Sequence, residues 1–67
     1  MSDRDRAEAL VIEARALLDN GDPLAARPLL DEAHDRFHRL GDRVGLAEAM
    51  ALLERCPTPP PTTPPTG

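Results

Sequence analysis

The sequence contains no tryptophan, no tyrosine, no lysine and a single phenylalanine among its 67 residues. With one phenylalanine and no tyrosine or tryptophan, it offers no aromatic platform on which successive nucleobases could stack. Its eight basic residues are all arginines that never adjoin one another, and twelve acidic residues outnumber them, giving a formal charge of -4. Nucleic-acid binding needs a basic surface that replaces counterions on phosphate, so this charge argues against a nucleic-acid partner.

Cysteine and long apolar segments are equally scarce. The single Cys56 cannot form an internal disulfide. No N-terminal segment is apolar enough for a signal peptide, and no stretch approaches the roughly 20 apolar residues of a membrane span. We therefore expect a cytoplasmic, reduced protein with no membrane partner. Because a domain of about 60 residues buries only about 60% of the surface of its unfolded chain, proteins of this size commonly depend on a metal, disulfides or oligomerisation.

Six of the eight prolines lie in the last eleven residues, PTPPPTTPPTG. Proline lacks an amide donor and has a fixed φ, so residues 57–67 are predicted to form an extended, disordered tail. The Pro-x-x-Pro spacings that begin at Pro57 and Pro61 suit aromatic-lined polyproline grooves, but a linker or hinge is the favoured interpretation. The folded domain is expected to cover residues 2–56.

The rest of the chain is rich in alanine and leucine, ten of each, which favours helices over strands. Apolar residues recur at helical spacing in three segments: between Ser2 and Gly21, between Pro23 and Leu40, and between about Arg43 and Arg55. The two Gly-Asp pairs between these segments can each end one helix and cap the next, and such short connections require antiparallel neighbours. The sequence therefore predicts an all-α, antiparallel three-helix unit. Its predicted core is Leu10, Ala14, Leu17, Ala26, Leu30, Ala33 and Phe37.

The third predicted helix resembles the first when the chain is compared with itself at an offset of 40 residues. Residues 7–10 (AEAL) then align with residues 47–50 (AEAM), and Ile12 aligns with Leu52. A period of this length, built from a helix pair, is typical of an α-solenoid, in which each hairpin packs against the next.

Residues 21–53, GDPLAARPLLDEAHDRFHRLGDRVGLAEAMALL, resemble the long-helix tetratricopeptide repeats of large actinobacterial transcriptional regulators and signalling ATPases. In that family a Gly-Asp turn, an Ala-Ala-Arg-x-Leu-Leu-x-Glu-Ala helix and a Leu-Gly-Asp-Arg turn recur at a similar interval. The resemblance places its small positions on Ala14, Ala26 and Ala33, and the second-helix Ala-x-x-x-Phe spacing on Ala33 and Phe37. It implies a non-catalytic protein–protein interaction module with one and a half repeats, where at least three are usual.

The third helix is apolar around most of its circumference. From Val44 to Leu53 only Glu48 is charged, and a helix that is apolar on every side is expected to be buried on every side. We predict self-association through this helix; docking onto a larger protein, as an adaptor, is the alternative. A third interpretation is that its alanines are simply good helix formers in contact with water. The predicted contact residues are Val44, Leu46, Ala49, Met50 and Leu53.

Two further features suggest chemistry. His34 and His38 stand four residues apart, which places both imidazoles on one helix face, as in some zinc sites. The other interpretation is that they are half-buried polar residues flanking Phe37. Cys56 could be a nucleophile, but catalysis needs an adjacent base and a pocket. We instead expect an inert, partly exposed thiol, no catalytic residues and no cofactor.

Overall fold

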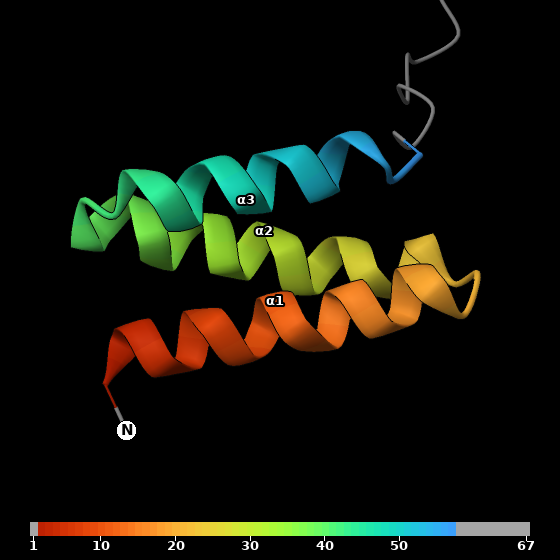
Figure 1. Ribbon diagram of the computed structural model, residues 1–67, viewed down its shortest axis with the longest axis horizontal. Helices are drawn as coiled ribbons and strands as arrows, with labels where there is room; N and C mark the ends of the chain where they lie inside the picture. Colours follow the sequence, from red (N-terminus) through yellow and green to blue (C-terminus); the bar gives the residue numbers. More distant parts are fainter. Residues whose placement is uncertain (1, 58–67) are drawn as a thin grey trace, which may run out of the picture.

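The computed structural model describes residues 2–57, and within this range the chain forms three α-helices and no strands. They are α1 (Asp3–Asp19), α2 (Pro23–Leu40) and α3 (Arg43–Glu54). Figure 1 shows that α2 runs antiparallel to both of its neighbours, so the chain forms two helical hairpins that share α2. The predicted all-α, antiparallel three-helix unit is confirmed. The predicted tail, beyond Pro57, lies outside the described residues.

Both connections between helices contain a Gly-Asp pair that ends one helix and caps the next. Gly41 adopts a left-handed conformation, with φ 69°, that suits a residue without a Cβ. The amide of Asp42 then donates to the carbonyl of Phe37 at 3.0 Å, which closes α2. The Asp42 carboxylate accepts from the amide of Gly45 at 3.1 Å, which caps α3. Residues 21–22 repeat this arrangement between α1 and α2, so connections of three residues (20–22) and two residues (41–42) reverse the chain.

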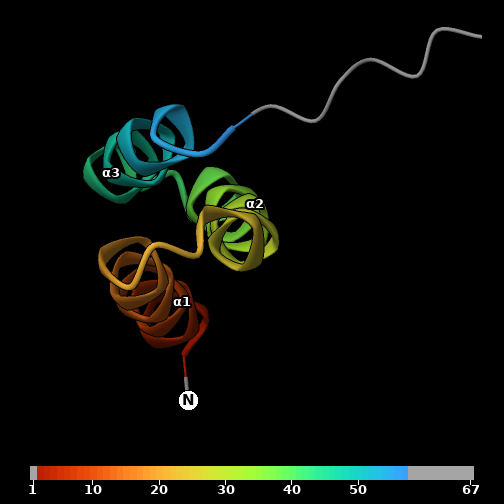
Figure 2. The same cartoon turned by 90° about the vertical axis from the view of Figure 1, so that its right-hand side faces the viewer.

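The core lies on the faces of α1 and α3 that meet α2. Viewed along the helices in Figure 2, α1 and α3 flank α2, and the contacts between α1 and α3 are few. Alanines occupy many buried positions and let the helix backbones approach closely. The structure buries six of the seven predicted core residues, and the seventh, Leu17, is partly buried against them. The buried set is Ala7, Leu10, Val11, Ala14, Ala26, Leu30, Ala33, Phe37, Gly45, Ala49, Leu52 and Cys56.

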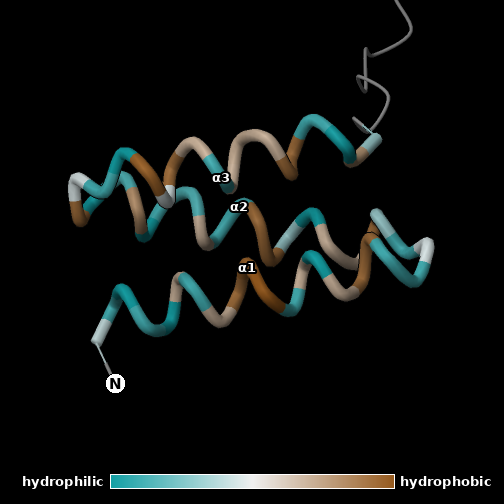
Figure 3. Tube along the Cα trace, in the orientation of Figure 1, coloured by the Kyte–Doolittle hydropathy of each residue, from teal (hydrophilic) through white to brown (hydrophobic). Residues whose placement is uncertain are grey.

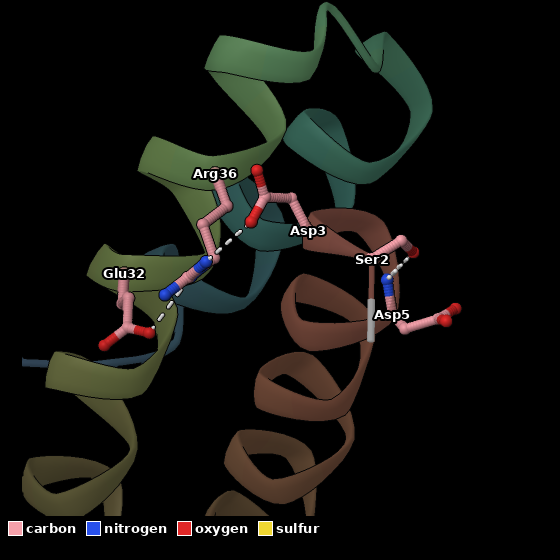
Figure 4. A network of polar contacts seen from close by, with 5 residues as sticks. All are labelled: Ser2, Asp3, Asp5, Glu32 and Arg36. Atoms are coloured by element: carbon pink, nitrogen blue, oxygen red, sulfur yellow. Dashed lines mark hydrogen bonds and ion pairs between the residues drawn. The ribbon is translucent and has the colours of Figure 1, made fainter.

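Polar contacts fix the position of α1 against α2 near the start of the chain (Figure 4). Arg36 of α2 donates from Nε to Glu32 in its own helix at 3.1 Å and from Nη1 to Asp3 of α1 at 3.2 Å. The hydroxyl of Ser2 accepts from the amide of Asp5 at 3.2 Å and caps α1. Exposed ion pairs of this kind contribute only about 0–1 kcal/mol each, so apolar packing supplies most of the stability.

Gly45 is a position of close approach between α3 and α2. Its backbone lies against the aromatic ring of Phe37, so closely that a Cβ at this position would overlap ring atoms of Phe37. The Phe37 side chain is itself 2% exposed, so the ring has little room to move away. A small residue at position 45 is therefore a packing requirement of the α2–α3 contact.

Gly45→Ala should destabilise the protein although alanine is the better helix former by about 1 kcal/mol. The added methyl group must displace a buried ring, and we expect the free energy of unfolding to fall by about 1–3 kcal/mol. Chemical denaturation followed by far-UV circular dichroism measures the change. Combining Gly45→Ala with Phe37→Leu should recover part of the loss. A single variant at least as stable as the parent would contradict the close contact.

Candidate interaction surface

Helix α3 packs on the rest of the molecule with a single narrow stripe. Gly45, Ala49, Leu52 and Cys56 are all buried, and their spacing of four, three and four residues places them on one side of the helix. Figure 3 shows few hydrophilic positions along α3 compared with α1 and α2. Since the buried stripe uses only part of this apolar circumference, apolar side chains remain on the opposite side.

A second stripe lies opposite the buried one. Arg43, Ala47, Met50 and Glu54 have the same spacing but begin two residues earlier. Two residues correspond to about 200° around a helix, so these four residues, here called the outer stripe, lie on the side of α3 opposite its buried stripe, with Met50 and Glu54 also bordering α2 residues. All four are exposed, and 51% of the Met50 surface is accessible. The outer stripe therefore has a short apolar middle and one charge of each sign at its ends.

The two edges of α3 differ in how much the hairpin covers them. Leu46 and Leu53 lie on the edge next to α2, are partly buried and pack against the core. Val44 and Ala51 lie on the other edge and are exposed, Val44 by 79%. The apolar surface of α3 thus continues from one edge across the outer stripe to the other.

Among the predicted contact residues, Ala49 is misplaced. Its side chain is fully buried within one chain, so it belongs to the core and cannot face a partner. The periodicity of α3 did not reveal this, because apolar residues surround the helix and several faces could equally have met α2. Of the other four, Met50 and Val44 are exposed, while Leu46 and Leu53 are partly buried.

The single acidic residue between Val44 and Leu53 is used within the molecule. Glu48 accepts a 2.6 Å hydrogen bond from Arg15 Nη2 of α1, which makes an ion pair between the two helices. This contact directs Glu48 towards α1 and away from the outer stripe. The apolar middle of the outer stripe therefore contains no charge.

A shallow groove of about 420 Å³ lies between α2 and α3. The groove is lined by Arg27, Asp31, His34, Met50, Leu53 and Glu54. Met50 and Leu53 provide its apolar surface, and polar residues from both helices surround them. Next to the groove, Nη1 of Arg27 donates to the carbonyl of Pro57 at 3.3 Å. A smaller hollow of about 180 Å³ is lined by residues of all three helices: Glu8, Val11, Ile12, Phe37 and Glu48.

The two histidines have different surroundings. His34 is half-buried and lines the groove, as the half-buried interpretation predicted. His38 is exposed, so that interpretation is wrong for His38. Within residues 2–57, no three histidine, cysteine or acidic side chains lie together as a metal site would require. The part of the chain that the structure describes therefore gives these histidines no third ligand.

Cys56 is 5% exposed, so the expectation of a partly exposed thiol is wrong. It lies two residues beyond the end of α3 but continues the buried stripe, and its Sγ donates to the carbonyl of Leu52 at 3.6 Å. A buried thiol of this kind packs as a small apolar side chain. Sequence reasoning missed the burial because Cys56 follows the last predicted turn, where helical spacing is a weak guide.

Comparison with protein-family models, curated proteins and solved structures found no match to this chain. None of the helices within residues 2–57 is long and apolar enough to cross a membrane. The function must therefore be inferred from the surface of α3 itself.

Burial of Cys56 predicts slow reaction with a thiol reagent such as Ellman's reagent. The native protein should react at least about tenfold more slowly than the denatured chain, because reaction requires local opening. A matched control combines Cys56→Ala with Ala51→Cys, which moves the thiol to an exposed position on the same helix and should restore rapid reaction. Equal rates for native Cys56 and the control would show that the thiol is accessible.

Proposed function

We propose that this protein is a non-catalytic protein–protein interaction module that associates with a second copy of itself through α3. The observation that supports this most directly is the exposure of Met50 and Val44 on a helix side that has no charge between Arg43 and Glu54. The outward positions of α2, by contrast, include Asp31, Glu32, Asp35 and Arg39, as expected for a face in contact with water.

The size of this surface indicates a weak, reversible association. Stable protein–protein interfaces bury about 1,200–2,000 Å² in total, whereas the outer side of a twelve-residue helix is considerably smaller. Burial of apolar surface contributes about 25 cal/mol per Å² before the cost of association is subtracted. We therefore expect a dimer whose population depends strongly on protein concentration.

The arrangement of the helices supports the resemblance to tetratricopeptide repeats. Helices α1 and α3 run parallel to each other and flank α2 (Figures 1 and 2). This is the order expected when one complete helix pair is followed by the first helix of the next. In such an array a further helix would cover the outer side of α3, and within residues 2–57 no such helix is present. A second copy of the chain can cover the outer side of α3 in place of that helix.

The groove between α2 and α3 favours a second candidate function, an adaptor that binds a different, larger protein. An amphipathic helix of that protein could place apolar side chains on Met50 and Leu53 and polar ones beside Arg27, Asp31 and Glu54. This candidate uses the groove between α2 and α3, which shares Met50 and Glu54 with the outer stripe, so the oligomeric state and not the surface alone distinguishes it from self-association. Sedimentation across a dilution series separates them, because an adaptor alone would remain at 7.3 kDa at every concentration.

Met50→Glu should abolish self-association. A buried carboxylate without a partner opposes association strongly, and we expect the dimer Kd to rise at least about tenfold. Analytical ultracentrifugation measures the mass between 7.3 kDa and twice that value. At concentrations where the parent is dimeric, its melting temperature should also fall, because dimerisation stabilises the folded state by mass action.

Ile12→Glu is the matched control, since Ile12 is another large exposed apolar residue, 68% accessible, but belongs to α1. It should leave the mass distribution unchanged. A parent protein that is dimeric but whose dimer Kd is unaffected by Met50→Glu would contradict the assignment of the dimer interface to α3.

A further inference from the structure

We infer that two copies of α3 pair antiparallel around a two-fold axis at the middle of the outer stripe, so that Arg43 of each chain faces Glu54 of the other. This inference rests on the proposed self-association and adds its orientation and register. It follows from the order of residues along the outer stripe and from the charges at the two ends of α3.

The outer stripe is self-complementary when reversed. Its residues follow the order basic, small apolar, large apolar, acidic: Arg43, Ala47, Met50, Glu54. A two-fold axis between its middle residues brings Met50 onto the partner's Ala47 and Arg43 onto the partner's Glu54. A large side chain then meets a small one, which allows close packing, and opposite charges meet at both ends.

The edges of α3 match in the same register. A two-fold axis perpendicular to both helices keeps each edge on its own side of the pair. Leu46 then lies near the partner's Leu53, and Val44 near the partner's Ala51. The apolar residues on the outer half of α3 therefore meet apolar residues, and the strongly exposed Val44 is covered.

The charges at the ends of α3 also favour the antiparallel orientation. Arg43 is the first residue of α3 and Glu54 the last, so each has the unfavourable sign for the dipole of its own helix. In an antiparallel pair Arg43 lies beside the partner's helix C-terminus and Glu54 beside the partner's N-terminus, where both signs are favourable. A parallel pair would instead oppose Arg43 to Arg43 and Glu54 to Glu54.

Both side chains are available for these contacts. Arg43 and Glu54 are exposed, and within residues 2–57 neither forms an ion pair or a side-chain hydrogen bond. Glu48, the other charged residue of α3, is already paired with Arg15. Forming the intermolecular pairs therefore breaks no polar contact seen in the single chain.

Charge reversal tests the register. Arg43→Glu alone places two acidic groups opposite each other at both ends of the dimer, and Glu54→Arg alone places two basic groups there. Each single variant should raise the dimer Kd at least about tenfold in low salt, because like charges face each other twice. The double variant Arg43→Glu/Glu54→Arg restores opposite charges and should return to within about threefold of the parent Kd.

Matched controls separate local pairing from net charge. Arg39→Glu on α2 and Glu13→Arg on α1 change the net charge by the same amounts at exposed positions away from α3, and each should leave the Kd near that of the parent. Far-UV circular dichroism verifies that every variant folds. As a check independent of the double variant, the two single variants should bind each other when mixed, since their charges are complementary.

The results of these experiments distinguish a wrong register from a wrong proposal of self-association. A parent that stays monomeric at all concentrations would refute self-association itself. A parent dimer that Met50→Glu dissociates, but whose Kd is the same in both charge-reversed single variants, would refute the register alone. Failure of the double variant to recover would refute the register as well.

Discussion

The packing surface that α2 offers to both neighbours is the constraint on which the rest of this structure depends. Its buried residues Ala26, Leu30, Ala33 and Phe37 lie between α1 and α3, and those two helices make few contacts with each other. Helix α2 is therefore the main neighbour of α3 within the described chain, and α3 meets it with a narrow stripe of mostly small residues. The proposed self-association through the opposite side of α3 follows from the apolar residues that α2 leaves exposed there.

Small residues make the limited contact stable. Ala49 is fully buried, and Gly45 lets the ring of Phe37 lie directly against the backbone of α3. Close approach of backbones increases the dispersion contacts of each buried atom. It also explains why α3 can be held by a narrow stripe while larger apolar residues, such as Met50, remain accessible on its other side.

The distribution of charge on α3 defines the kind of partner that it suits. Glu48 pairs with Arg15 of the same chain, which leaves Arg43 and Glu54 as the charged ends of an otherwise apolar stripe. A surface that is apolar in the middle and has opposite charges at its two ends matches a reversed copy of itself. The proposed pairing would add apolar burial to a domain of a size that buries only about 60% of the surface of its unfolded chain.

The helices and their connections can be predicted from the amino-acid sequence alone. Local physics governs these features: Gly41 and Asp42 end one helix and cap the next through hydrogen bonds within a few residues, and the spacing of Leu30, Ala33 and Phe37 defines a buried stripe. Which part of the apolar circumference of α3 is covered depends instead on how the helices pack in three dimensions. Helical periodicity gives the angles between residues of one helix but not the direction of its neighbour, so Ala49 could be assigned to the core and Met50 to the surface only once α2 was in place. The burial of Cys56 and the different exposure of His34 and His38 depend on the same long-range contact.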